Sequence, residues 1–137
     1  TDMTAKRHIM ADGAAPPPRT ARYSHAVAAG GWLYVTGQLP VNPDDPAGPL
    51  PDGIAAQTEM AFRNLEIILA AAGYDFSDTV FARIFLSNFD RDYADMNAVF
   101  HRYYDDEGTM PSRTTVGVAK LGRDALVEID LVLFKGA

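Results

Sequence analysis

Two segments near the C-terminus constrain the fold of this 137-residue chain more than any other feature. Side chains of a β-strand point alternately to opposite faces, so alternation over 112–120 and 125–134 predicts two strands. In the second strand, one face is apolar and consists of Val127, Ile129, Leu131 and Leu133. In the first strand, one face combines threonine and valine, namely Thr114, Val116 and Val118.

The opposite face of these two strands carries the polar residues. Matching the apolar rows predicts that the helices lie on one side of the sheet and that Arg113, Thr115 and Glu128 lie together on the other. A monomer seldom exposes an apolar patch of more than a few hundred Å². We therefore expect copies of the chain to associate through this face with closed cyclic symmetry. The large apolar residues expected there are Trp32, Tyr34, Phe81, Phe85, Leu126, Val132 and Phe134.

The remaining periodicity predicts one α/β (α+β) domain. The β-prone runs 23–28 and 32–37 flank Gly30-Gly31, which is typical of a hairpin. Segments 54–73 and 90–105 have helical spacing, with a strand at 79–86 between them. The order β-β-α-β-α-β-β predicts a mixed sheet with both helices on one face. The inward residues are Val80, Ala82, Ile84 and Leu86 in the strand, and Tyr93, Met96, Asn97, Phe100 and Tyr104 in the second helix.

Two further segments have no clear periodicity. Residues 1–22 are interpreted as an N-terminal arm before a domain at 23–137, with 7–10 either a short strand or part of a loose arm. Within it, the run 16–18 consists of prolines and cannot be helical. The loop 39–53 is rich in proline; a loop of this length is often functional, but a tolerated surface excursion fits equally well.

Composition excludes several function classes. The chain has no cysteine, so disulfides, thiolate metal sites and a cysteine nucleophile are absent. A net charge of −6 suits the chain poorly to neutralising nucleic-acid phosphates. No apolar run approaches the roughly 20 residues of a membrane-spanning helix. We expect a cytoplasmic protein that binds neither nucleic acid nor membrane.

Arg113 and Glu128 are the residues most suggestive of chemistry. A guanidinium matches both oxygens of a carboxylate, and a nearby glutamate can accept a proton from water. Together they favour hydrolysis of a small substrate that carries a carboxylate. A structural ion pair across two strands explains the same residues equally well.

A set of ordered blocks from Tyr23 to the end resembles the RidA/YjgF family. The blocks are Tyr-Ser-His-Ala-Val at 23–27, Leu-Tyr-Val-Thr-Gly-Gln-Leu-Pro at 33–40, Gln-Thr at 57–58, Asn-Leu-Glu-Ile-Ile-Leu at 64–69, Ala-Gly at 72–73, Met-Asn at 96–97, Pro-Ser-Arg-Thr-Thr-Val at 111–116 and Val-Glu-Ile-Asp at 127–130. No single block is specific, but their order and spacing are.

This resemblance implies a chorismate-mutase-like fold, a homotrimer and active sites in clefts between adjacent subunits. It also implies an enamine/imine deaminase, which hydrolyses 2-aminoacrylate or 2-iminopropanoate to a 2-keto acid and ammonia. No metal or organic cofactor is implied.

The resemblance also assigns roles to individual residues. Arg113 corresponds to the arginine that binds the carboxylate and Glu128 to the glutamate that positions water. Tyr23 corresponds to a tyrosine that closes the pocket. Thr36 stands for a serine and, with Gly37, lines the pocket.

Two further positions are less settled. Asn97 corresponds to an asparagine that shapes the cleft, although hydrogen bonding between helix and loop explains it equally well. Thr115 stands where many members have cysteine, so a hydroxyl replaces the thiol. Together with Thr36 and the proline-rich arm, this departure suggests a subgroup with a different substrate.

Several functions remain open at this stage. A pathway-specific deaminase, acting on a substrate such as 2-aminomuconate, would share the same residues. A ligand-binding or chaperone-like trimer without turnover belongs to another class. Ribonuclease activity, which has been attached to the family, is disfavoured by the acidic composition.

Overall fold

All the strands belong to one sheet in the computed structural model, which describes residues 5–136. The sheet has six strands in the order β1-β2-β3-β6-β4-β5. The elements are β1 Arg7–Ile9, β2 Ala26–Ala29, β3 Trp32–Gln38, α1 Ile54–Ala72, β4 Thr79–Leu86, α2 Phe89–Tyr103, β5 Ser112–Gly117 and β6 Val127–Phe134, with 3₁₀ turns η1 Phe76–Asp78, η2 Glu107–Thr109 and η3 Gly122–Asp124. Residues 1–4 of the arm interpreted from the sequence, and residue 137, lie outside the described residues.

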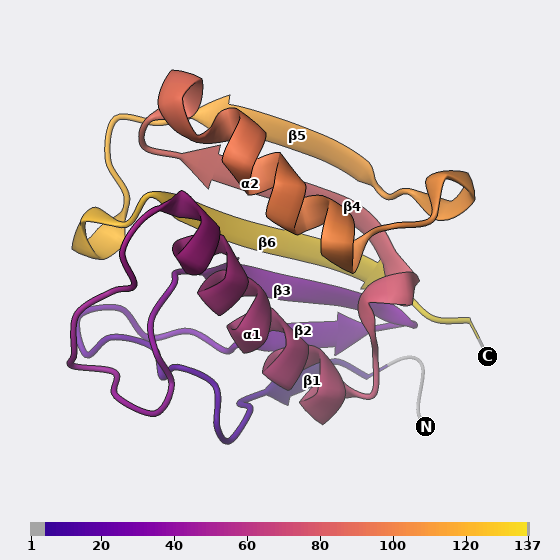
Figure 1. The fold of residues 1–137 in the computed structure, drawn as a ribbon. Coiled ribbons are helices and arrows are strands. Elements are labelled where there is room, and N and C mark those ends of the chain that lie inside the picture. The colour runs from indigo at the N-terminus through magenta and orange to yellow at the C-terminus, as the bar shows by residue number, and fades with distance from the viewer. Residues whose placement is uncertain (1–4, 137) are drawn as a thin grey trace.

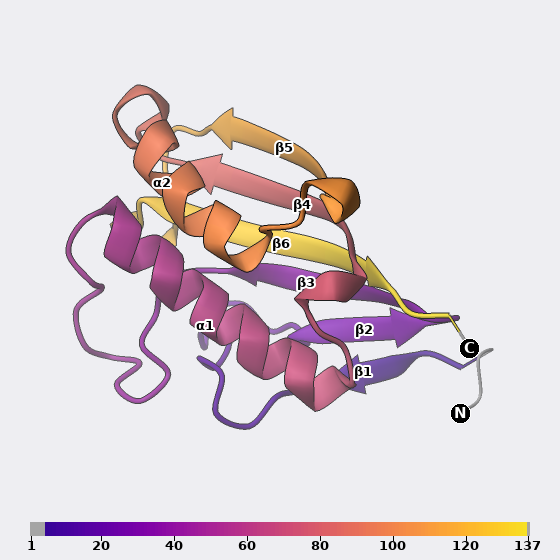
Figure 2. The ribbon, with the colours of Figure 1, turned by 45° about the vertical axis from the view of Figure 1, so that its right-hand side comes forward.

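The sheet is mixed, and both helices cover the same face of it (Figures 1 and 2). Strands β4 and β5 pair in parallel, whereas the other neighbours pair antiparallel. The predicted fold class is confirmed. The short strand considered at 7–10 forms as β1, which pairs with β2. We call the sheet surface that bears α1 and α2 the helix face, and the opposite surface the outer face.

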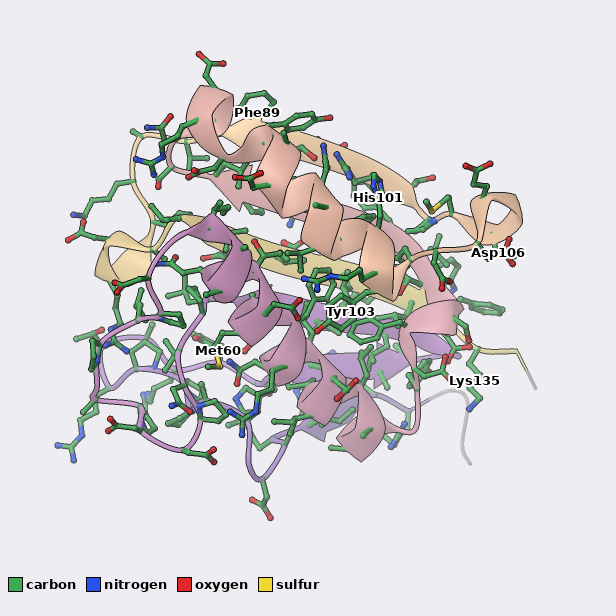
Figure 3. All side chains as sticks on the ribbon, in the orientation of Figure 1. Met60, Phe89, His101, Tyr103, Asp106 and Lys135 are labelled. Carbon is green, nitrogen blue, oxygen red and sulfur yellow. The ribbon has the colours of Figure 1, made fainter. Side chains whose placement is uncertain are left out.

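The core lies between the helices and the helix face. Helix α1 ends at Gly73, whose φ of 84° is left-handed and favours glycine. Phe62 of α1 is fully buried and stacks on Tyr103 of α2 with 4.2 Å between ring centroids. In Figure 3, Tyr103 points from α2 toward α1. Replacing Phe62 with Ala would therefore cost about 3–5 kcal/mol, because it leaves a cavity and removes one of the contacts between the two helices.

Two residues expected on the inward side are exposed. Val80 is exposed because the pairing of β4 with β6 shifts register between Thr79 and Phe81. Tyr93 is 37% exposed although it lies on the inward side of α2, near the edge of the sheet. The other inward residues of β4 and α2, apart from half-buried Asn97, are buried.

The outer face is strongly apolar, as predicted. Trp32, Tyr34 and Phe134 are 39%, 57% and 41% exposed. Trp32 and Phe134 are paired across β3 and β6, with ring centroids 4.8 Å apart. Leu126 is an exception, because it packs against the core instead.

None of the helices among residues 5–136 has the length and apolar character needed to cross a membrane.

Candidate active site

Arg113 lies on the helix face of the edge strand β5. Its neighbour in β4 is Ala82, which is fully buried beneath the helices. The guanidinium carbon of Arg113 lies 4.8 Å from the ring centroid of Phe100 and 5.8 Å from that of Tyr93, both in α2. Its Nη2 donates a hydrogen bond of 3.2 Å to the Tyr93 hydroxyl. Aromatic groups thus hold the guanidinium, and among the described residues no carboxylate lies within ion-pair distance of it.

Two more predicted residues belong to the surroundings of Arg113. Thr115 follows two residues later on the same face of β5, beside Ile84. Asn97 lies four residues after Tyr93 and three before Phe100, on the side of α2 that faces Arg113. The Asn97 Oδ1 and the Thr115 Oγ1 are buried without a hydrogen-bond partner among the described residues. Buried polar atoms normally have partners, so these two atoms are candidates to bind a polar group of a ligand between α2 and β5.

Glu128 lies on the outer face instead. Its neighbour in β4 is Phe85, while Val127 and Ile129 on either side of it are fully buried on the helix face. The carboxyl group rests against the backbone of β3 at Gly37. A Cβ added at Gly37 would meet the Glu128 Cδ at 2.9 Å, so the flexible end of the Glu128 side chain would have to move. Gly37 is therefore needed here for the space it leaves, not for its backbone angles.

Glu128 and Tyr23 line one cavity of about 800 Å³ together with Gly37. Burial raises the pKa of the Glu128 carboxyl, and the charge of Asp130 raises it further, while Arg83 opposes both. Folding therefore favours the protonated form. This contribution to stability is complete below the unfolded pKa and is lost as the pH rises through the folded pKa. Burial also raises the pKa of Tyr23, with a smaller effect from Glu128.

Thr36 does not present its hydroxyl to this cavity. The Thr36 Oγ1 donates a hydrogen bond of 2.7 Å to the backbone carbonyl of Ser24. It is also not among the residues that line the cavity. In the single chain its hydroxyl therefore fastens β3 to the segment before β2.

The prediction that Arg113, Thr115 and Glu128 share one face is wrong. The sheet separates Arg113 and Thr115 from Glu128, so no cleft within one chain contains all three. The error came from matching the row of Thr114 and Val116 to the core. In the parallel pairing with β4 that row lies on the outer face, where Val116 is 38% exposed.

The single chain thus contains two separate polar clusters. We call Arg113, Asn97 and Thr115 the arginine half-site, and Tyr23, Gly37 and Glu128 the glutamate half-site. The first lies between β5 and α2, and the second lies on the outer face near β3 and β6. Within residues 5–136 no three histidine, aspartate or glutamate side chains come together as a metal site would require.

Sequence reasoning missed the residues that hold the arm and the proline-rich loop in place. The ring of His25 accepts a 2.9 Å hydrogen bond from the Ala11 amide at Nδ1, and its Nε2 lies 2.8 Å from the Ala15 carbonyl. Asn64 of α1 accepts from the Ala15 amide and donates to the Val41 carbonyl. Both side chains are buried. The only available signal was their presence in the quoted blocks, which says nothing about their partners.

Several solved structures share this fold. A Rid-family protein from Yersinia pestis has a TM-score of 0.86 and 32% identity, covering 96% of this chain and all of that one. The YjgF protein of E. coli has a TM-score of 0.83 and 30% identity, covering 95% and 100%. TdcF of E. coli, solved with bound serine, has a TM-score of 0.83 and 27% identity, also covering 95% and 100%.

Sequence comparison identifies the family itself. The family described as endoribonuclease L-PSP matches residues 13–134. A RutC family protein from Sulfurisphaera tokodaii is 38% identical over 122 residues, which cover 89% of this chain and 94% of that protein. One from Synechocystis is 35% identical over 130 residues, which cover 95% and 96%. The chain belongs to this family, the RidA/YjgF family that the sequence blocks resemble.

Proposed function

We propose that this protein is an enamine/imine deaminase whose active sites form between neighbouring copies in a homotrimer. Each site would combine the arginine half-site of one copy with the glutamate half-site of the next. The observation that carries the proposal is the guanidinium of Arg113, which is held by Tyr93 and Phe100 but lacks a carboxylate partner among the described residues. A substrate carboxylate is the natural partner for such a group.

The arginine half-site would bind the carboxylate of the substrate. A guanidinium can form two parallel hydrogen bonds with a carboxylate, which also fixes the orientation of the carbon next to it. The buried oxygens of Asn97 and Thr115 offer an acceptor for the substrate nitrogen and a hydroxyl for a further hydrogen bond. The relative TdcF was solved with serine, a small molecule that carries such a carboxylate.

The glutamate half-site would handle the water. The raised pKa of Glu128 suits it to take a proton from water and to return it later in the reaction. Tyr23, in the same cavity, would help to enclose the substrate. Gly37 contributes the space that lets the carboxylate reach this position.

The reaction that follows is hydrolysis of a carbon–nitrogen double bond. An enamine first takes a proton at its β-carbon and becomes an iminium ion, the protonated imine. Glu128 removes a proton from water while the water oxygen bonds to the imine carbon. That proton then passes from Glu128 to the nitrogen, the carbon–nitrogen bond breaks as the new hydroxyl returns its proton to Glu128, and ammonia and a 2-keto acid result. The iminium carbon is already electrophilic, so these residues need only orient it and supply the base.

Association of copies would both complete the site and cover the outer face. Trp32, Tyr34 and Phe134 leave an apolar surface that water solvates poorly. The edge strand β5 carries Arg113 at the margin of the sheet. An edge residue can approach the outer face of another copy in an assembly with closed rotational symmetry.

The test is the release of ammonia and 2-keto acid when the protein is added to a dehydratase that generates 2-aminoacrylate. We expect Arg113→Ala to lower kcat/KM roughly a hundredfold or more, because two charge-assisted hydrogen bonds are lost. Arg102→Ala is a matched control, since Arg102 is an exposed arginine of α2 paired with Glu59. It should keep full activity and the same oligomeric state.

Other outcomes would favour other functions. Lack of acceleration by the wild-type protein on 2-aminoacrylate and on longer imines would refute the deaminase proposal. Binding of 2-keto acids that depends on Arg113, without turnover, would identify a ligand-binding trimer. Turnover restricted to one member of a panel of imines would identify a pathway-specific deaminase.

A further inference from the structure

The cavity beside Glu128 is larger than a three-carbon imine requires. Its volume of about 800 Å³ lies within the range of pockets that enclose drug-sized ligands. Pro16 and Pro17 of the arm, with Leu39 and Val41 of the loop, give it apolar walls. The arm and the loop keep their positions through His25 and Asn64. This cavity can therefore take a substrate with a long side chain.

Two arginines also line this cavity, Arg19 from the arm and Arg123 from η3. Glu128 is the carboxylate among its lining residues. The nearby acidic groups Asp44 and Asp124 already pair with Arg63 and Lys120. Within the described residues, neither Arg19 nor Arg123 has an ion-pair partner. The cavity therefore places two guanidinium groups, neither of them in an ion pair, against the single carboxyl group of Glu128.

The backbone at Arg123 is strained, and hydrogen bonds hold its side chain in place. Its φ is 57° and that of Asp124 is 54°, both in the left-handed region that residues other than glycine rarely adopt. The guanidinium donates hydrogen bonds of 2.8 and 2.7 Å to the Pro46 and Gly48 carbonyls. A guanidinium has five N–H donors, so donors remain for a ligand. Backbone strain of this kind concentrates at functional sites.

We propose that the substrate is a 2-imino acid, or its enamine, whose side chain ends in a second carboxylate. This inference rests on the proposed function. Arg113 of a neighbouring copy would hold the carboxylate next to the imine carbon. The substrate side chain would lie along the proline and leucine walls, and its terminal carboxylate would meet Arg19 and Arg123.

The test compares two imines of equal chain length, generated in place by an amino acid oxidase. 2-Iminopentanoate, from norvaline, lacks the second carboxylate, and 2-iminoglutarate, from glutamate, carries it. We expect kcat/KM to be about tenfold or more higher for 2-iminoglutarate, the effect of one or two charge-assisted hydrogen bonds. Added salt should reduce the preference, because exposed charges are screened.

Variants assign the preference to the two arginines. Arg19→Gln should lower the preference about tenfold while leaving turnover of 2-iminopentanoate unchanged. Arg19 is exposed, so this variant should fold normally. Arg123→Gln should lower the preference in the same way, and Arg123→Lys should retain part of it. Because Arg123 also bonds carbonyls of the loop 39–53, thermal unfolding of each variant checks that the loop is still stable. Arg22→Gln is the control, because Arg22 is exposed and close in sequence but does not line the cavity.

Binding of the keto acids separates this inference from the proposed function. 2-Ketoglutarate should bind more tightly than 2-ketopentanoate in calorimetry, and Arg19→Gln should abolish the difference. Absence of turnover with any imine would refute the deaminase while leaving this binding result to decide the inference. A wild-type protein that does not prefer the diacid, or a preference that survives both arginine variants, would overturn it.

Discussion

At the residue scale, the side chain of Glu128 occupies the space that a Cβ at residue 37 would fill. Because Gly37 has no Cβ, the carboxyl group of Glu128 lies against the backbone of β3 and is half-buried. That burial is the main reason for the raised pKa of Glu128. The position of the Glu128 carboxylate in β6 thus depends on the absence of a Cβ at Gly37 in β3.

We expect Gly37→Ala to displace the Glu128 carboxylate toward solvent. Deaminase activity should fall about a hundredfold, the usual loss when a general base is misplaced. Because the displaced carboxyl is better solvated, its pKa should drop toward the ordinary value, and the acidic limb of the profile of kcat/KM against pH should move to lower pH. A Gly136→Ala control, at the exposed C-terminal end, should change neither measurement. An unmoved acidic limb would contradict this account of Glu128.

Site residues could be predicted from the sequence better than their arrangement. The blocks pointed to Arg113 and Glu128 as chemically important, and each does lie in a polar cluster. Alternation along β5 gave two possible faces, and the apolar row of Val116 pointed to the wrong one. On an edge strand both faces carry partly exposed residues, so apolar alternation does not identify the core side.

At the element scale, the arm becomes part of the domain through His25. The Nδ1 of its ring must lack a proton to accept from the Ala11 amide, and the Nε2–H then donates to the Ala15 carbonyl. One side chain of the segment leading into β2 thereby fixes residues on both sides of a bend. The prolines that line the cavity follow directly after this bend.

We expect His25→Ala to lower the free energy of unfolding by about 2–4 kcal/mol, since it leaves a buried amide and a buried carbonyl unpartnered and creates a cavity. His8→Ala is the matched control, because His8 is exposed on β1 and should change stability by less than about 0.5 kcal/mol. Denaturation in urea measures both values. Hydrogen exchange at the Ala11 amide should accelerate only in the His25 variant, and equal exchange in the two variants would contradict the role of His25.

Elements with strong periodicity were the easiest to predict. The helix expected at 54–73 is α1, and the strands expected at 79–86 and 125–134 contain β4 and β6. The exception at Val80 follows from a register shift in the pairing with β6, which no local pattern reveals. The partners of His25 and Asn64 lie 10–49 residues away in the chain, so they depend on the completed fold.

At the scale of the whole molecule, the two half-sites lie on opposite faces of the sheet. Arg113 lies under α2 on one side and Glu128 against Gly37 on the other. The proposed deaminase therefore requires at least two copies for each active site. This requirement distinguishes it from a hydrolase that works within one chain.

We expect mixed assemblies of two inactive variants to regain activity. We expect Arg113→Ala and Glu128→Gln each to be nearly inactive alone, whereas random mixing at equal amounts should give intact pairs at about a quarter of the sites. Co-expression followed by an ammonia-release assay measures this recovery. Wild type mixed equally with the variant that carries both substitutions should retain about a quarter of full activity. If each site lay within one chain, the same mixture would retain about half. Failure of the mixed variants to recover activity would exclude sites between copies.

Because the sheet separates Arg113 from Glu128, we expect turnover to depend on protein concentration. In the proposed deaminase, a newly synthesised chain would hold both parts of the reaction centre and could use neither until it meets other copies. Dilution below the dissociation constant of the assembly should lower the rate per chain, whereas the rate of an enzyme complete in one chain would stay constant. Specific activity measured over a dilution series would thus report the strength of the assembly without any structural probe.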